Sequence, residues 1–423
     1  MSSFARTAGN SDSPTLKHDF ELTDPPTDSI SSLSFSTQAN HLVVGSWDTS
    51  VRIYEVSSGQ GQRIQSQGRA MYNHDGPVLS VCWNQDGTRV FSGSTDNTAR
   101  IYDIASGQSF QIAQHEAPVK TIRFFVHPQS HTGILVTGSW DKTLKYWDTR
   151  SPSGTPIHKV TLPDKVYDFD VLYPYLVIGT AQAPGQTLNA NSGDQVKPIH
   201  IFHLNNPTIP FKSVVPPLKK QIRALRCFSG IAPGAKTRGS NTMMNDEYCG
   251  FVVGGTEGRA AVQYTDDQNA GHSYSFKCHR QDIDPRLRDQ GIVHAINDLA
   301  FHPVTKTLAT CGSDGVFYFW NLESRTRLKT FSTSSLPANP LASSTSFNSF
   351  SNPGSSGTTS PNSDPSITTM AFNAPGTLLA YAVSYDWHKG FTGMTPGYRN
   401  GVFVKAISEE DIGNKKQTEI GRR

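Results

Sequence analysis

Two sets of side chains in this sequence could carry out nucleophilic chemistry. Each set has an upstream His, followed by a Ser and an Asp two positions apart: His74, Ser94 and Asp96 in the first, and His115, Ser139 and Asp141 in the second. Ser, His and Asp act in hydrolases as nucleophile, general base and orienting acid. A nucleophile is not needed in every copy of a repeat, so the recurrence favours a structural role. We expect hydrogen bonds among these side chains and Trp147 to pin the outer strand of each repeat to its inner strands.

The second set lies in a segment that predicts a β-hairpin. In 136–150, VTGSWDKTLKYWDTR, a strand ends at Thr137, Asp141 and Lys142 make a tight turn, and residues 143–147 alternate as a second strand. The Trp147-Asp148 dipeptide is typical of WD-repeat propeller blades. Similar hairpins occur at 43–55, 90–103 and 308–321. The first three copies recur at about 45 residues, which is the period of a four-stranded blade.

The remaining apolar runs complete a ring. Three well-marked blades are predicted at 29–55, 74–103 and 115–150, and a sixth at 293–321, whereas the fourth (166–204), fifth (222–264) and seventh (366–407) lack the full signature. A lone alternating strand at 15–22 precedes the first blade and can complete the last one, which would remove an exposed edge. The predicted fold is therefore all-β, a single seven-bladed WD40 β-propeller over residues 15–407, closed by an N-terminal strand.

Four segments fall outside the blade pattern. Residues 1–14 are polar and residues 408–423 are charged, and both are expected to be tails. Residues 332–365 are rich in Ser, Asn and Pro and predict a disordered insertion between blades six and seven. Residues 265–291 form a second insertion, which carries an aromatic strand and a basic cluster.

Composition argues against several classes of protein. The net charge is +3, so no global basic field indicates nucleic-acid binding, and any such site must be local. The five cysteines show no metal-ligand spacing, and no cofactor or metal site is predicted. The glycine-rich run at 254–259 lacks the Lys-Ser/Thr of a phosphate loop. Because no run of about 18 apolar residues occurs, we expect a soluble, intracellular protein without membrane insertion. No GxSxG, HExxH or paired CxxC motif appears, so the chain is not expected to be an enzyme.

Basic and aromatic residues gather near the fifth to seventh blades. Phe276, Lys277 and Arg280 lie together, and Trp387 precedes Lys389 after an apolar strand. These residues can be interpreted in two ways. They are either ordinary solvated charged residues and loop aromatics, or they form a groove that binds the phosphates and stacks the bases of single-stranded nucleic acid.

Several motifs resemble those of one family. PPTDSISSLSF, GPVLSVCW, TGSWDKTLKYWDTR, FKCHR and SYDWHKG are similar to the nuclear-pore-associated mRNA export factors of the WD-repeat class, the Gle-two/Rae-one type, over roughly residues 16–406. A sister family of mitotic checkpoint adaptors shares the EGR turn and FKCHR, but lacks the Asp386-Trp387 and Lys389-Gly390 pattern. His388, the long Ser/Asn insertion and the extended 183–197 loop depart from the export-factor pattern without touching its shared motifs.

The resemblance implies a non-enzymatic adaptor in nuclear export of mRNA. Such a protein docks a short hairpin segment of an FG-repeat nucleoporin on one propeller face, contacts RNA or messenger ribonucleoprotein through a basic rim, and acts in the nucleus and at the nuclear pore, shuttling to the cytoplasm. The resemblance also implies an RNA-binding role for a set of five residues: Phe276, Lys277, Arg280, Trp387 and Lys389. The alternative is a spindle-checkpoint adaptor that binds checkpoint kinases and other mitotic checkpoint proteins.

Overall fold

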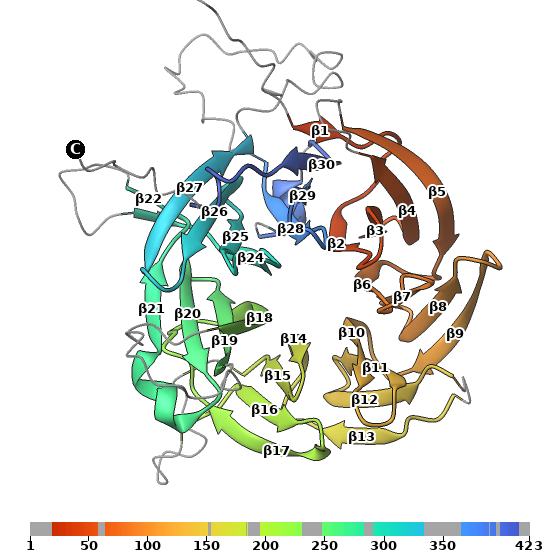
Figure 1. Cartoon of the computed structure of the whole chain (residues 1–423), viewed down its shortest axis with the longest axis horizontal. Coiled ribbons are helices and arrows are strands. Elements are labelled where there is room, and N and C mark those ends of the chain that lie inside the picture. The colour runs from red at the N-terminus through yellow and green to blue at the C-terminus, as the bar shows by residue number, and fades with distance from the viewer. Residues whose placement is uncertain are drawn as a thin grey trace, which may run out of the picture.

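Short runs of alternating or wholly apolar residues build most inner strands of this protein, as in ISSLSF at Ile30–Phe35 and VLSVCW at Val78–Trp83. The computed structural model describes residues 19–57, 64–150, 154–182, 184, 195–230, 248–282, 291–333, 365–388, 390–394 and 398–413. Seven four-stranded antiparallel sheets stand as blades around a central axis (Figure 1). The predicted all-β seven-bladed propeller is confirmed.

The first four blades follow the chain in order, each from its inner to its outer strand. Blade one holds β2 (Ile30–Phe35), β3 (His41–Ser46), β4 (Ser50–Ser57) and β5 (Gln65–Asn73). Blade two holds β6 (Val78–Trp83), β7 (Arg89–Ser94), β8 (Thr98–Asp103) and β9 (Gln108–Gln114). Blade three holds β10 (Val119–His127), β11 (Thr132–Ser139), β12 (Thr143–Asp148) and β13 (His158–Thr161). Blade four holds β14 (Val166–Leu172), β15 (Tyr175–Thr180), β16 (Ile199–His203) and β17 (Asn206–Val214).

The last three blades include the closing strand. Blade five holds β18 (Ile222–Gly230), β19 (Tyr248–Gly255), β20 (Arg259–Tyr264) and β21 (Tyr274–Lys277), with the 3₁₀ helix η1 (Asp267–His272) before β21. A small hairpin of β22 (Arg280–Asp282) and β23 (Gly291–Val293) leads to blade six, which holds β24 (Ile296–Phe301), β25 (Leu308–Gly312), β26 (Val316–Asn321) and β27 (Thr326–Ser332). Blade seven holds β28 (Ile367–Phe372), β29 (Leu378–Val383), β30 (Gly401–Ala406) and β1 (Phe20–Glu21).

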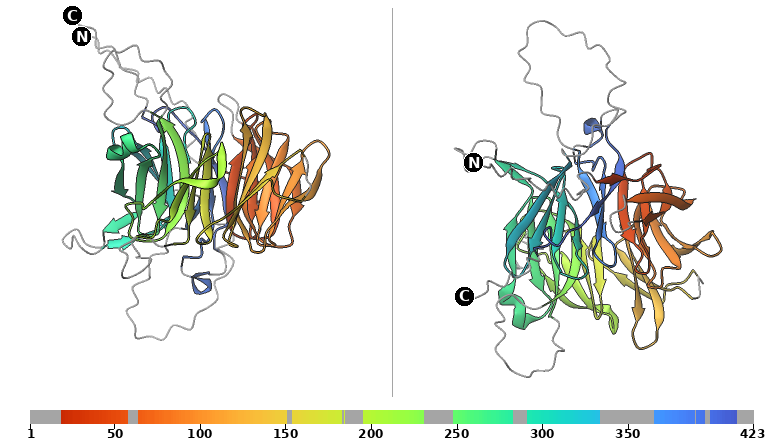
Figure 2. Two further views of the ribbon diagram at one scale, coloured as in Figure 1. Left: turned by 90° about the horizontal axis from the view of Figure 1, so that it is seen from below. Right: turned by 45° about the horizontal axis from the view of Figure 1, so that its top comes forward.

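An Asp-centred turn joins the second and third strands of the well-marked blades. The carboxylates of Asp48, Asp96 and Asp141 each accept the backbone N–H two residues later, at 3.0, 2.8 and 2.9 Å. The residue between, such as Lys142 with φ of 64°, takes the left-handed conformation. Because strands alternate in direction, these turns share one face of the ring with the connections from each blade to the next; we name it the turn face. Figure 2 shows the blades standing side by side with loops on two opposite faces.

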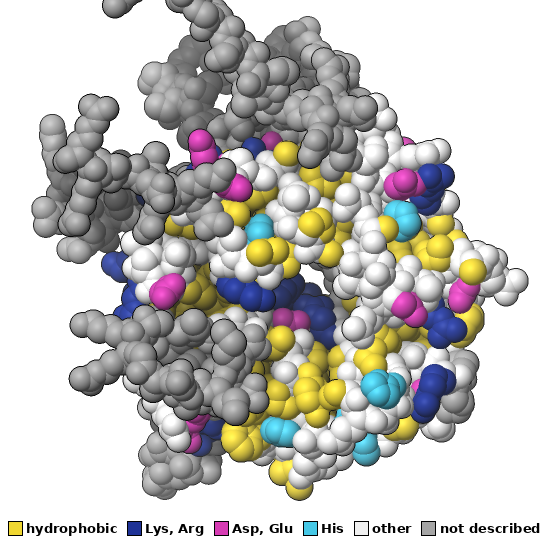
Figure 3. Space-filling view, in the orientation of Figure 1, with side chains coloured by type: hydrophobic (Ala, Val, Ile, Leu, Met, Phe, Trp, Pro, Cys, Tyr) yellow, Lys and Arg dark blue, Asp and Glu magenta, His cyan; other side chains and the backbone are white. Residues whose placement is uncertain are grey.

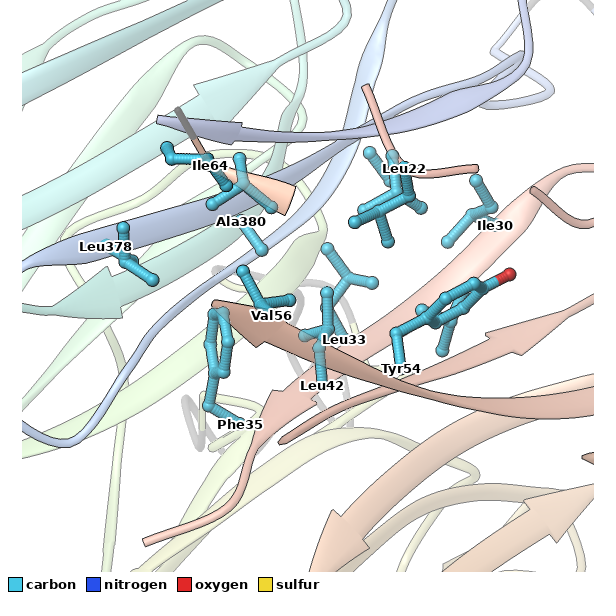
Figure 4. Close-up of a cluster of buried hydrophobic side chains, with 14 residues drawn as sticks. Leu22, Ile30, Leu33, Phe35, Leu42, Tyr54, Val56, Ile64, Leu378 and Ala380 are labelled. Carbon is cyan, nitrogen blue, oxygen red and sulfur yellow. The ribbon is translucent and has the colours of Figure 1, made fainter. Parts of the chain in front are cut away.

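The ring is closed where the N-terminal strand β1 joins the last blade. β1 pairs with β30, with Phe20 opposite Val404 and Glu21 opposite Phe403. Leu22, just after β1, is buried in a cluster that joins blade seven to blade one and is shown in Figure 4. The predicted closure is confirmed, although residues 15–18 of the expected strand lie outside the described part of the chain.

Side chains of the inner strands tie neighbouring blades together around the axis. Ser32 accepts the backbone N–H of Val81, Asp168 accepts that of Leu225, and Asp298 accepts that of Met370, at 2.9–3.2 Å. Each bond runs from one blade to the next. The inner wall is therefore a belt of polar links, while apolar clusters fill the space between blades farther out.

The structure changes three details of the sequence prediction. The aromatic strand expected within an insertion is β21, the outer strand of blade five, which supplies the fourth strand that blade needs. The charged C-terminal segment begins with packed residues, because Asp411 is buried beside Lys329 and Ile412 packs on the cluster between blades six and seven. Ser332, expected in the disordered insertion, ends β27. Residues 1–14, 334–364 and 414–423 lie outside the described residues.

Removing the closing strand should destabilise the protein. Deletion of residues 1–22 exposes the edge of β30 and removes Leu22 from its cluster, and Leu22→Ala should alone cost about 2–4 kcal/mol of unfolding free energy. Thermal and denaturant melting measure both effects. Deletion of residues 1–14 is the control and should melt like the full chain; equal loss in the two truncations would contradict closure by β1.

Candidate peptide and nucleic-acid interface

The His, Asp and Trp singled out in blade three form a buried hydrogen-bonded chain. His115 Nδ1 lies 2.8 Å from Asp141, and its Nε2 lies 2.7 Å from the hydroxyl of Thr137. The indole N–H of Trp147 donates to the same hydroxyl at 2.8 Å. Ser139 instead donates to the carbonyl of Ala117 and accepts the N–H of Asp141, so it holds the turn. The sequence reasoning missed Thr137, which lies two residues earlier on the same side of β11.

The same arrangement recurs at two other places. In blade two, His74 lies between Asp96 (2.9 Å) and Ser92 (2.7 Å), while Ser94 holds the turn by donating to Gly76. Between blades five and six, a third copy was not foreseen: His279 contacts Asp314 at 2.8 Å and Thr310 at 3.0 Å, and Trp320 donates to Thr310.

In these sets the side chains are hydrogen-bonded in the order of a hydrolase triad, but a substrate cannot reach the hydroxyl groups. The hydroxyls of Ser92, Thr137 and Thr310 belong to residues with no exposed surface, and that of Thr137 already receives the Trp147 donor. A nucleophile must reach its substrate, whereas these hydroxyls lie inside the blades. The arrangement therefore serves as a clamp that joins strands within and between blades.

A cavity of about 400 Å³ opens at the centre of the turn face. Its aromatic lining includes Trp47 of blade one, Trp140 of blade three and Trp387 of blade seven, together with Tyr167 of blade four and Tyr385 of blade seven. Trp47 and Trp387 stack with ring centroids 5.6 Å apart, and each is more than a third exposed, at 37% and 38%. Two large aromatic side chains thus form a half-exposed shelf at the mouth of the ring.

Asp386 fixes the loop that carries Trp387. Trp387 takes a φ of 61°, which is strained for a residue with a side chain. The carboxylate of Asp386 accepts from Asn297 at 2.9 Å and also from Ser313 and His388. Burial raises the pKa of this carboxyl, but the hydrogen bonds outweigh burial and lower the pKa to about 2. An ionised Asp386 therefore ties the loop to blade six.

The wall of the cavity is positively charged beneath the shelf. Lys120 and Arg223 both line it, and burial lowers the pKa of each. Arg223 donates to the backbone oxygen of Asp386 at 3.2 Å. Within the described ranges, Lys120 has neither an ion pair within 4 Å nor a hydrogen bond, although the more distant Asp168 and Asp298 favour its charged form. Figure 3 looks onto the face opposite the turn face, where Lys and Arg side chains are visible around the other end of the central opening.

Deeper in the channel the charges neutralise one another. Arg226 contacts Asp168 at 2.8 Å and Asp298 at 2.7 Å, and Arg123 contacts Asp170 at 3.0 Å. The two carboxylates that flank Arg226 raise its pKa despite burial. The charge left uncompensated therefore lies at the mouth, where a ligand can reach it.

The other residues assigned to RNA lie apart from the shelf. Phe276 and Lys277 are consecutive in β21, so their side chains point to opposite sides of blade five. Phe276 packs on Trp320 of blade six with centroids 4.6 Å apart, whereas Lys277 is exposed opposite Arg259. Arg280 is exposed just beyond β21 and donates to the carbonyls of Glu257 and Gly258. Lys389 lies outside the described residues.

The described residues contain no group of three or more His, Cys, Asp or Glu side chains placed to hold a metal ion. They also contain no helix long and apolar enough to cross a membrane.

Comparison with known proteins places the chain among WD-repeat proteins of RNA export. The family model described as "WD domain, G-beta repeat" matches residues 17–55, 65–103, 107–148 and 290–321. The chain is 39% identical to the Poly(A)+ RNA export protein of Schizosaccharomyces pombe, covering 94% of this chain and 93% of that protein. It is 38% identical to Protein Rae1 of Drosophila melanogaster (95% and 98% covered) and 37% identical to mRNA export factor GLE2 of Chaetomium thermophilum (93% and 91%).

A solved structure shares the fold. The structure of U3-55K superposes with a TM-score of 0.64 over 93% of this chain and 100% of that one, at 16% identity. Likeness at that level of identity supports the propeller architecture alone.

Breaking the blade clamp should cost stability. Asp141 is nearly buried and accepts from His115, Thr143 and the backbone of Glu116, so Asp141→Asn should lower the free energy of unfolding by about 2–3 kcal/mol. Denaturant melting measures the change. Asp148→Asn affects only a surface ion pair with Arg150 and the hydrogen bond from the backbone N–H of that residue, and should stay within about 0.5 kcal/mol of the parent. A wild-type melt for Asp141→Asn would mean that the clamp does not hold the blade.

Proposed function

This chain belongs to the Rae1/Gle2 family of WD-repeat mRNA export factors, and on that premise we propose that it is a non-enzymatic adaptor tethered to the nuclear pore. It holds an extended segment of an FG-repeat nucleoporin on the turn face and contacts RNA or messenger ribonucleoprotein through neighbouring basic residues. It works in the nucleus and at the pore, and passes to the cytoplasm with its cargo. The observation that carries the proposal is the aromatic, positively charged cavity at the mouth of the ring.

The cavity suits a peptide with apolar and acidic side chains. Trp47 and Trp387 offer apolar surface and need no movement to do so, since their stack holds them in place. Lys120 and Arg223 lie below them with burial lowering the pKa of both. Burial takes water away from the two positive charges, and a carboxylate placed between them would stabilise both charges in its place. An acidic side chain is therefore the favoured occupant.

The RNA contact is assigned to the rim beside this cavity. Trp387 exposes enough ring surface to stack a base, and Lys277 and Arg280 are exposed cations at the turn-face end of β21. Phe276 contributes from the seam between blades five and six. Lys389, three residues beyond the anchoring Asp386, is retained in the proposal from the family resemblance.

A checkpoint adaptor is the competing function. Both functions need a propeller face that grips a short segment of a partner, so the partner decides between them. Affinity purification of the tagged chain from its own cells should recover nucleoporins as the main partners. Recovery of checkpoint kinases without nucleoporins would replace the export proposal.

Neutralising Lys120 should weaken nucleoporin binding. Lys120→Met keeps most of the side-chain volume and removes the charge, and loss of one partner from a buried charge pair costs about 2–5 kcal/mol, or at least tenfold in Kd. Calorimetric titration with the hairpin segment of the nucleoporin measures the effect. Lys159→Met, on exposed β13, is the matched control. Equal affinity of the two variants would exclude the cavity as the docking site.

Truncating Trp387 should weaken RNA binding. Stacking contributes about 1–3 kcal/mol per base, so Trp387→Ala should reduce affinity for single-stranded RNA roughly tenfold or more. Lys277→Glu with Lys389→Glu should reduce it too and flatten its salt dependence. Affinity across salt concentrations and thermal melting are measured on the same variants. Unchanged affinity in a folded Trp387→Ala protein would remove RNA from this loop.

A further inference from the structure

Two lysines face each other on the outer strands of blade three. Lys145 of β12 and Lys159 of β13 are cross-strand partners. The backbone N–H of Leu162 donates to the carbonyl of Lys142, so hydrogen-bonded pairs fall at every second position from there, and the two lysines form a pair without hydrogen bonds of its own. Side chains stand closest in such pairs, and like charges placed directly opposite repel each other. The fold therefore holds two positive charges together on one face of this blade.

Neither lysine makes an ion pair with a carboxylate in the part of the chain that the structure describes. Lys145 is held in place by a hydrogen bond from its Nζ to the carbonyl of Gln114 in blade two, at 2.8 Å, whereas Lys159 is exposed. Burial lowers the pKa of Lys145, the carboxylates of Asp141 and Glu116 act against that shift, and the charge of Lys159 lowers the pKa further. A negative group supplied from outside the chain would therefore stabilise both ammonium groups.

An exposed phenylalanine of blade two borders the same junction between blades. Phe110 lies opposite Ile101 in the β8–β9 ladder, and Ile101 packs with Trp147 in the cluster that joins blades two and three. Trp147 is two residues from Lys145, so both project from β12 toward blade two. Phe110 is 42% exposed, and blades two and three stand side by side in the ring (Figure 1). We name Phe110, Lys145 and Lys159 the two-three patch.

The outer edge of β13 is open beside this patch. β13 is the last strand of blade three, and no described strand pairs with its outer edge. His158 and Val160 hold the hydrogen-bonded positions of the β12–β13 ladder, so the backbone N–H and C=O of Lys159 and Thr161 point away from the blade. An extended peptide can pair with such an edge. Every second side chain of that peptide would then face the lysines.

We propose that the two-three patch docks an extended, acidic segment of a partner protein. The segment adds to the edge of β13, places a carboxylate on Lys145 and Lys159, and packs an apolar side chain two residues away on Phe110. The inference goes beyond the proposed function, because none of these residues lines the cavity at the mouth of the ring. The patch and the cavity can therefore hold different partners at the same time.

Two features favour a peptide over RNA at this patch. The free N–H and C=O groups of Lys159 are a donor and an acceptor that match a peptide backbone, whereas a phosphate group only accepts. The cations are lysines, which bind as point charges and lack the planar guanidinium on which a base could stack. Trp147, the largest ring at the junction, is buried and offers no stacking surface.

The test titrates the full chain into a fluorescein-labelled peptide, Ser-Leu-Thr-Glu-Thr-Leu-Ser, and follows fluorescence anisotropy. A leucine lies two residues from the glutamate in either direction, so the probe fits whichever way it pairs; a companion peptide has glutamine in place of glutamate. K145Q/K159Q removes both patch charges, whereas the control R69Q/K306Q removes two cations from the outer strand of blade one and a loop of blade six. Binding of the glutamate peptide should fall about fivefold in K145Q/K159Q and stay near wild type in the control. The glutamine peptide should bind the wild-type chain about fivefold more weakly than the glutamate peptide.

Several results would overturn the patch. They are no binding of the glutamate peptide by the wild-type chain, equal affinity of the two double variants, and equal affinity of the two peptides. Tighter binding of a labelled oligouridylate that K145Q/K159Q abolishes would assign the patch to RNA instead. A concentration-dependent sedimentation coefficient that the same variant abolishes would assign it to a second copy of the chain.

A crosslinking measurement on the wild-type chain decides the matter if K145Q/K159Q melts early. The glutamate peptide with photoreactive leucine in place of both leucines should modify tryptic peptides that contain Phe110 or β13. Crosslinks confined to residues around the cavity would exclude the two-three patch and leave the nucleoporin proposal standing.

Discussion

Two distant parts of the chain meet in a single sheet, where β1 pairs with β30 and Leu22 enters the cluster between blades seven and one. Each blade is a wedge whose two faces must both be covered, so an open ring would expose apolar surface at two places together. Pairing of the N-terminal strand with the last blade removes both exposures and the free edge of β30. The belt of polar links along the inner strands then has no loose end, because Thr368 of blade seven donates to the carbonyl of Ile30 in blade one at 2.8 Å.

Closure also creates the proposed docking cavity. Trp47 and Trp387 are 340 positions apart in the sequence, and they stack only because blade one stands beside blade seven. Lys120 and Arg223 come from blades three and five and face the same opening. A rigid ring thus gathers single residues from many repeats at one mouth, where no local segment could assemble them. The strain at Trp387 is tolerated because Asp386 is held by three donors from its own loop and from blade six.

The repeat pattern predicted the architecture because blade hairpins carry local signals. An Asp turn, alternating strands and a terminal Trp occur within a few residues of one another, and the closing strand follows from the need to cover an edge. Side-chain partners across blades were harder to foresee. His279 lies between Lys277 and Arg280 in the sequence, and no nearby residue indicates its partner, because Asp314 comes from the next blade. Phe276 and Lys277 looked like one site, yet strand alternation separates them. Only β21's place as the outer strand of blade five shows which neighbour each one meets.

The distribution of charge assigns the two proposed ligands to different surfaces of the propeller. Inside the channel, Arg226 and Arg123 are matched by aspartates, which makes that region structural. At the mouth, Lys120 and Arg223 lie beneath the tryptophans, and burial lowers the pKa of both side chains. A ligand must therefore bring negative charge into a confined space. One or two carboxylates of a peptide fit this condition better than a phosphate backbone. At the rim, Lys277 and Arg280 are exposed, a setting in which long-range attraction to a polyanion is strong and depends on salt. The same propeller therefore offers a confined site suited to a specific peptide and an open site suited to RNA of any sequence.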